Sequence, residues 1–188
     1  MLRLLLRLSS TIDRFTGGLG RVLRWLTLAM VLIAAANAVL RYAGRFVGMN
    51  LTSNATIEAQ WYLFSIVFLL GATVAVQRDA HVRVDVFYGR LTARGRAIID
   101  LAGGLLLLIP FSWFAFWVCS PSVRASVAVW EVSPDPGGLP RWPIKSLMLV
   151  CFGLLMAQGG SEVVKRLAFL VGVEVPGWNP PGADEETA

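Results

Sequence analysis

The chain has 188 residues, of which 56% are hydrophobic and 15% are charged, and its mean hydropathy is +0.64. Soluble domains contain about 25% charged residues, so this composition excludes an ordinary water-soluble protein and indicates helices that cross a membrane. The net charge is +5. Because the basic residues are sorted by segment along an apolar chain, this charge indicates membrane topology rather than nucleic-acid binding.

Residues 1–20 are predicted to form an amphipathic segment that lies at the membrane interface. A polar stripe at helical spacing runs along one side of it, and leucines cover the rest. The glycines within residues 17–20 are expected to interrupt this helix before the first membrane span. The alternative is that the segment simply extends the first span. The stripe consists of Arg3, Arg7, Ser10 and Arg14.

Four longer stretches contain no charged residue: Trp25–Leu40, Ala59–Val76, Leu101–Val123 and Ser146–Ser161. About 20 helical residues cross the hydrocarbon core of a bilayer. With their polar flanks, these stretches predict four transmembrane helices in one membrane domain of residues 21–170. The fold class is therefore an all-α integral membrane protein. The expected helices are 21–43, 55–78, 93–121 and 143–170, and residues 171–188 are expected to form a flexible acidic tail.

Local signals refine these helices. Thr92 is placed to cap the third helix, and Pro110 is expected to bend it. Small residues recur at four-residue spacing, for example at Gly71 and Ala75, and serve either packing within the bundle or docking of a second membrane protein. Tryptophan and arginine side chains near the span ends are typical interface anchors. The predicted anchors are Arg3, Arg7, Arg14, Trp25, Trp61 and Trp142.

The distribution of basic residues predicts the orientation. Twelve of the 17 lie before the first span, between the second and third spans, or near the C-terminus, where Lys165 and Arg166 are counted with the tail. The remaining five lie at the other ends of the spans. The positive-inside rule then places both termini in the cytoplasm and the 1–2 and 3–4 loops outside.

The uncharged interiors argue against chemistry within the membrane. Proton relays and ion coupling usually need an intramembrane acid or histidine, and the four stretches contain neither. One histidine and two cysteines cannot supply a metal or haem site. We therefore predict a protein that is not an enzyme and binds no cofactor. Glu58, at the start of the second helix, is interpreted either as an acid that stabilises a helix N-terminus or as a partner contact.

Three polar segments carry more specific information. The second helix begins with Glu58-Ala-Gln60-Trp-Tyr-Leu-Phe, and the loop after it reads Arg78-Asp-Ala-His81-Val-Arg83-Val-Asp85-Val. The segment before the fourth helix reads Pro136-Gly-Gly-Leu-Pro140-Arg-Trp-Pro-Ile-Lys145. The loop around His81 is either a structured turn or a recognition surface. In these segments, and in its four spans, the chain resembles the DctQ-like small membrane subunit of tripartite ATP-independent periplasmic (TRAP) transporters, over about residues 20–170.

The resemblance implies an inner-membrane subunit that pairs with a large permease of roughly twelve spans. The large subunit would hold the substrate and sodium sites and move as an elevator, while a periplasmic binding protein delivers an organic acid. The small subunit would enlarge the static scaffold and offer its outward loops to the binding protein. A membrane anchor or assembly subunit of an unrelated complex is the alternative. The predicted partner contacts are Glu58, Gln60, His81, Arg83, Asp85, Arg141 and Lys145.

Overall fold

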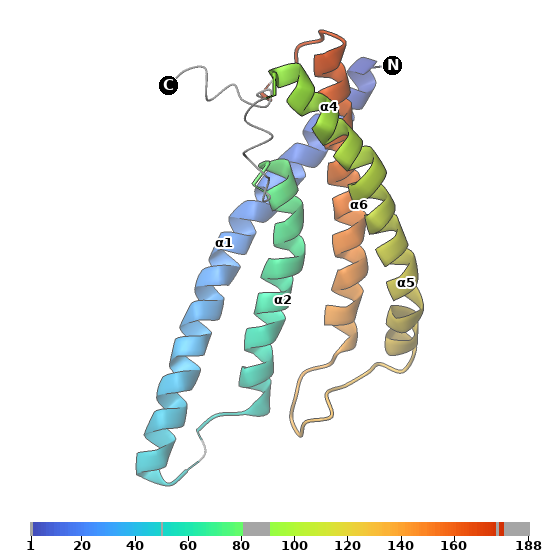
Figure 1. Ribbon diagram of the computed structural model, residues 1–188. Coiled ribbons are helices and arrows are strands. Elements are labelled where there is room, and N and C mark those ends of the chain that lie inside the picture. The colour runs from blue at the N-terminus through green and yellow to red at the C-terminus, as the bar shows by residue number, and fades with distance from the viewer. Residues whose placement is uncertain (1, 50, 81–90, 176, 179–188) are drawn as a thin grey trace. The chain divides into compact units, whose positions relative to one another are not determined.

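The computed structural model describes residues 2–49, 51–80, 91–175 and 177–178, and its described residues form helices joined by turns and loops (Figure 1). Four helical segments are long and apolar enough to cross a membrane, as the sequence predicts. The third segment combines α4, a short π-helix η1, and α5. The elements are α1 (Leu2–Val47), α2 (Asn54–Gln77), α4 (Ala93–Gly103), η1 (Gly104–Leu108), α5 (Ile109–Ala128) and α6 (Trp142–Leu170).

The break expected near residue 20 is absent, because α1 is a single helix of 46 residues. Each glycine in a helix costs about 1 kcal/mol relative to alanine, but contacts with α6 hold the preceding residues in place. Ser9, Asp13 and Thr16 lie on one side of α1 and bind side chains of α6. The prediction of a separate N-terminal helix is therefore wrong, and its position at the membrane surface stays a prediction.

The third segment begins at Ala93, as predicted, and Thr92 caps it by accepting a hydrogen bond from the Gly95 N–H. Its helical geometry changes just before Pro110. In η1 the backbone forms a wider π turn, closed by the Ile109 N–H on the Gly104 carbonyl. Proline has no N–H to continue the α-helical ladder, so this irregular turn accommodates the loss.

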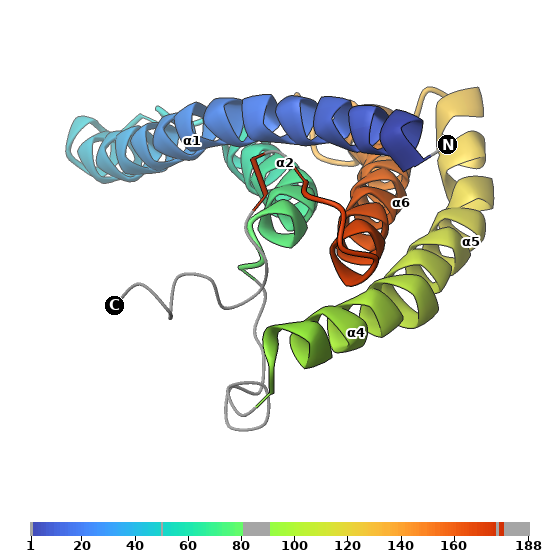
Figure 2. The same cartoon turned by 90° about the horizontal axis from the view of Figure 1, so that it is seen from above.

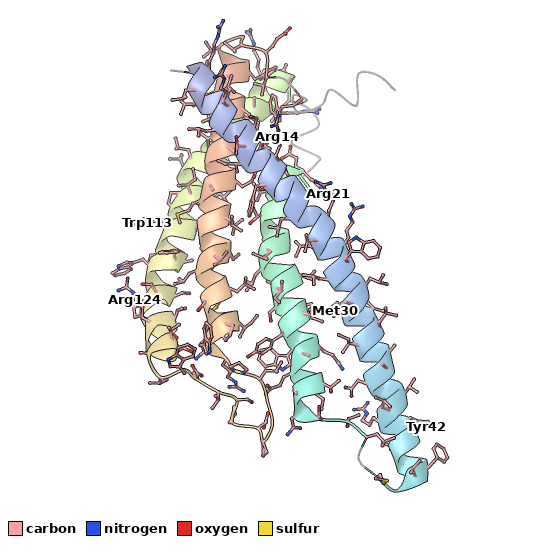
Figure 3. All side chains as sticks on the ribbon, turned by 180° about the vertical axis from the view of Figure 1, so that it is seen from behind. Arg14, Arg21, Met30, Tyr42, Trp113 and Arg124 are labelled. Carbon is pink, nitrogen blue, oxygen red and sulfur yellow. The ribbon has the colours of Figure 1, made fainter. Side chains whose placement is uncertain are left out.

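The chain divides into two compact units, each of which is described by itself. The terminal unit comprises residues 1–17, 73–115 and 152–188, and the loop unit comprises residues 18–72 and 116–151. Within the terminal unit, the first turns of α1 and the residues of α4 lie beside the C-terminal part of α6 (Figure 2). Large apolar side chains point outward from the helices, as Trp113 does in Figure 3. Trp113 is 64% exposed.

Candidate functional site

One side of α6 in the terminal unit is polar and buried. Its residues are spaced three or four apart over about two turns, so they share one face of the helix. None is more than 7% exposed, and all contact other polar side chains. These residues are Gln158, Ser161, Glu162, Lys165 and Arg166. We call them, together with Asp13, Asp79 and Asp100, the ion network.

Both cations of the ion network are paired with several carboxylates. The Lys165 Nζ lies 2.5 Å from Glu162 Oε1 and 3.1 Å from Asp13 Oδ2. Arg166 pairs with Glu162, and its Nη2 lies 3.1 Å from Asp79 Oδ1 and 3.2 Å from Asp100 Oδ2. Because buried charges are tolerated only when paired and hydrogen-bonded, these contacts explain how α6 buries a lysine and an arginine.

The carboxylates reach α6 from three other segments. Asp13 is on α1 and Asp100 is on α4, while Asp79 follows the last residue of α2. At that end the Ala80 N–H bonds to the Ala75 carbonyl, and Asp79 adopts a left-handed φ of 56°. This is the hydrogen-bond pattern of a helix C-cap, in which aspartate tolerates the left-handed position better than most residues. The local ending of α2 thus presents a carboxylate to Arg166.

Neutral polar groups complete the ion network. The Ser9 and Ser161 hydroxyl oxygens are 2.6 Å apart, and the Thr16 hydroxyl donates to Gln158 Oε1 at 2.8 Å. The Gln158 amide donates to Asp13 Oδ1 at 2.8 Å. Fully satisfied polar networks rigidify a structure. Chemically, this arrangement can hold four chain segments together. In the described parts of the chain, no group of three His, Cys, Asp or Glu residues is placed to bind a metal ion.

The ion network corrects one expectation from the sequence. Lys165 and Arg166, counted with the cytoplasmic tail, lie within α6 and are 3% and 4% exposed. No role for Asp13 is predicted from the sequence, because it lies outside the arginine stripe of the same helix. The signal was present: Ser9, Asp13 and Thr16 repeat at i, i+4 and i+7, matching the polar spacing on α6.

In the loop unit, Glu58 binds the loop that precedes α6. Its carboxylate accepts hydrogen bonds from the Ser133 hydroxyl and the Leu139 N–H, and it is 3% exposed. The first turn of α2 contains no acidic residue, so Glu58 does not act as the helix-start acid considered from the sequence. Two neighbours on α2 also contact this loop: the Asn54 amide donates to the Pro136 carbonyl at 3.0 Å, and the Tyr62 hydroxyl donates to the Pro140 carbonyl.

We call these contacts the loop clasp: Asn54, Glu58 and Tyr62 on α2, with loop residues 133–140. The three α2 residues are four positions apart and therefore lie along one side of the helix. The clasp also explains Gly138. A Cβ there would lie 2.7 Å from Glu58 Oε2 and 2.5 Å from the Ser133 Cβ, so any larger residue would displace the loop. The neighbouring Gly137 has a φ of +72°, which favours glycine.

The two cations predicted as loop contacts have different surroundings. Lys145 Nζ lies 2.5 Å from Glu131 Oε2, and this ammonium holds the pKa of the Glu131 carboxyl below its ordinary value. Arg141 bonds to Glu131 only through its backbone N–H, at 2.8 Å. Its Nε is buried without a hydrogen-bond partner among the described residues. The Arg141 guanidinium forms no ion pair among the described residues, although its charge helps to lower the pKa of the Glu131 carboxyl.

The other predicted site residues are placed as follows. Gln60 lies on α2, and its Nε2 is buried without a partner among the described residues. His81, Arg83 and Asp85 lie outside the described residues. The Trp142 ring contacts Trp130 at 5.2 Å between centroids. The predicted anchors Arg3, Arg7, Arg14, Trp25 and Trp61 are exposed, and their contact with lipid stays a prediction.

The sequence matches the model of a transporter family. The model of the family "Tripartite ATP-independent periplasmic transporters, DctQ component" matches residues 30–169, which include Glu58, the clasped loop and the α6 side of the ion network. A Haemophilus influenzae protein named as a TRAP transporter small permease is 34% identical over 80 residues, or 43% of this chain. The match spans about half (47%) of that relative's length. No solved structure matches. Because the family model covers most of the chain, this multi-pass inner-membrane protein belongs to the DctQ family of TRAP transporter components.

Proposed function

We propose that this chain is the small permease subunit of a sodium-coupled transporter that imports an organic acid with a periplasmic binding protein. Membership of the DctQ family supports a role as a transporter subunit. The sodium and substrate sites would lie on a large partner subunit, because the apolar stretches of this chain contain no acid or histidine.

The ion network is the observation that supports a scaffolding role. Its lysine and arginine are paired with carboxylates from three other segments, and its amide and hydroxyl groups bond to one another. Breaking a buried pair by removing one partner costs about 3–5 kcal/mol, so segments joined in this way resist relative movement. A subunit of this kind can stay fixed while a partner subunit moves.

The loop clasp supports a second role, which is docking of the binding protein. In the proposed orientation both termini are cytoplasmic, and residues 129–141 face the periplasm. The clasp fixes this loop before any partner arrives, and preorganised loops bind with less loss of conformational entropy. Arg141 would then pair with a carboxylate on the surface of the binding protein.

Reconstituted transport tests the proposed function. Proteoliposomes that contain this chain, the cognate large permease and the binding protein should take up the organic acid only under an inward sodium gradient. Leaving out any one of the three proteins should abolish uptake. Sodium-driven uptake by this chain alone would refute the proposal.

A charge reversal at Arg141 tests the docking role separately. Arg141→Glu should weaken binding of the binding protein by about tenfold, because a cation that pairs with a carboxylate of the binding protein is replaced by an anion that repels it. The membrane complex should remain assembled. Arg124→Glu, at an exposed position on α5 (Figure 3), is the matched control and should bind normally. Equal affinities for both variants would remove Arg141 from the interface while leaving the transporter role intact.

A further inference from the structure

A shallow groove of about 560 Å³ lies between α1 and α2 within the loop unit. Its lining is apolar apart from one amide, and two of the four α1 residues that line it are alanines. Met30, Ala34 and Ala35 line it from α1, and Gln60, Trp61 and Phe64 line it from α2. Phe64 is 56% exposed, so the groove opens outward from the helix pair.

Two polar atoms of this helix pair have no partner among the described residues. One is the donor Gln60 Nε2, on a residue that lines the groove, and the other is the acceptor Asn37 Oδ1, which lies outside the lining, three residues after Ala34 on α1. Both atoms are buried within an apolar helix pair, where an unpaired amide group is unfavourable. An occupant that offers both an acceptor and a donor would satisfy them, whereas a lipid acyl chain offers neither.

The surrounding surface permits close approach of a helix backbone. Gln60, Phe64 and Gly71 repeat at i, i+4 and i+11 and therefore lie along one stripe of α2. No atom lies within 4 Å of the position that a Cβ on Gly71 would occupy. Transmembrane helices associate through such small residues together with interhelical hydrogen bonds, because the hydrophobic effect does not drive association in lipid.

We propose that this groove receives a transmembrane helix of the large permease subunit, and that Gln60 and Asn37 hydrogen-bond to it. This inference rests on the proposed function and adds the face and the residues through which the two subunits meet. Ala34 and Ala35 admit the partner's backbone, and Gln60 supplies a donor to a polar group on the partner helix.

Photo-crosslinking in native membranes tests the contact directly. The full chain carries p-benzoylphenylalanine at position 34, inside the groove, or at position 36 as a control, and is co-expressed with the cognate large permease. Ala36 is exposed, does not line the groove, and lies about 200° further round the helix. Position 34 should crosslink to the large subunit, and position 36 should not. A crosslink from position 34 to phospholipid or to a second copy of this chain would overturn the proposal.

Co-purification separates this proposal from the proposed function. Ala34→Trp fills the groove and should reduce recovery of the large subunit by about tenfold, whereas Ala36→Trp should not reduce it. Gln60→Leu should reduce recovery roughly threefold to tenfold, while the melting temperature of the isolated subunit stays equal or rises, since the substitution removes an unpaired buried donor. Normal recovery of the large subunit with all three variants would contradict docking at the groove and leave the proposed function unaffected. If the wild-type chain recovers no large permease, both proposals fail.

Discussion

The ion network and the loop clasp both join segments that are distant in the sequence, but they do so with different chemistry. The ion network contains two buried cations, each paired with at least two carboxylates. The loop clasp relies on one carboxylate, which accepts hydrogen bonds from a hydroxyl and a backbone N–H, and it contains no full positive charge. The difference suggests a division of roles: the ion network stabilises the subunit, and the loop clasp shapes a surface for a partner.

The largest effect is expected from removing the Arg166 guanidinium. Arg166→Met would leave Glu162, Asp79 and Asp100 without their shared cation and should cost about 3–5 kcal/mol of unfolding free energy. The measurements are membrane yield and thermal unfolding in detergent. The control is Arg14→Met, at an exposed position on α1 (Figure 3), which should change stability little. Equal stability of the two variants would contradict a stabilising network.

A smaller effect is expected at the contact between α1 and α6. Asp13→Asn should cost about 1.5–3 kcal/mol, the usual value of a charge-assisted hydrogen bond, because Lys165 and Gln158 both bind this carboxylate. In a double-mutant cycle with Lys165→Met, the double variant should lose less stability than the sum of the losses of the two single variants. Strictly additive effects on thermal stability would show that the two residues do not interact.

A comparable or smaller effect is expected in the loop clasp, and mainly on the loop itself. Gly138→Ala places a Cβ against Ser133 and Glu58 and should cost about 1–3 kcal/mol of local stability. Limited proteolysis of residues 129–141 should become faster, while the complex with the large subunit stays assembled. Gly153→Ala, where no atom lies within 4 Å of the added Cβ, is the matched control. A loop that resists protease equally in both variants would argue against the clasp.

The smallest effect is a dependence on pH at the Glu131–Lys145 pair. The pKa of the Glu131 carboxyl is lower in the folded protein because of Lys145. The ionised Glu131 carboxylate therefore stabilises the loop above the ordinary pKa of glutamate, and this stabilisation is lost as the pH falls through the pKa in the folded protein. Protease resistance of the loop should therefore decrease in acid. Glu131→Gln should weaken this dependence, and the part that remains would come from the Glu58 carboxylate, which binds the same loop. A variant that keeps the full wild-type acid profile would show that Glu131 does not contribute.

Much of the fold follows from the sequence, because long uncharged stretches have few alternatives to a membrane-spanning helix. Thr92 was also predictable, since a capping residue acts on its own neighbours. The break predicted from the glycines near residue 20 is wrong because tertiary contacts outweigh local helix propensity. The ion pair between Asp13 and Lys165 holds this part of α1 in place despite the low helix propensity of glycine.

The two clusters were harder to predict because each depends on which helix faces touch. The sequence predicts that Glu58 is either a helix-start acid or a partner contact, but its loop partners lie 75 and 81 residues away in the chain and could not be identified from the sequence. Lys165 and Arg166 were interpreted as tail charges because a basic residue at a helix end usually faces water. Only the positions of Asp13, Asp79 and Asp100 show that this end of α6 is enclosed.

The π turn before Pro110 has a consequence for how side chains are directed along the third segment. A π turn holds one residue more than an α-helical turn, and one residue corresponds to about 100° of rotation. Within the terminal unit, the start of α5 is therefore set out of phase with α4: Asp100 faces Arg166, while Ser112 is enclosed and Trp113 points outward. Deleting one residue from Gly104–Leu108 would turn the π turn into an ordinary α turn and leave the flanking side chains facing as they do now, whereas the same deletion from an uninterrupted α-helix would rotate Asp100 relative to Ser112 by about 100°.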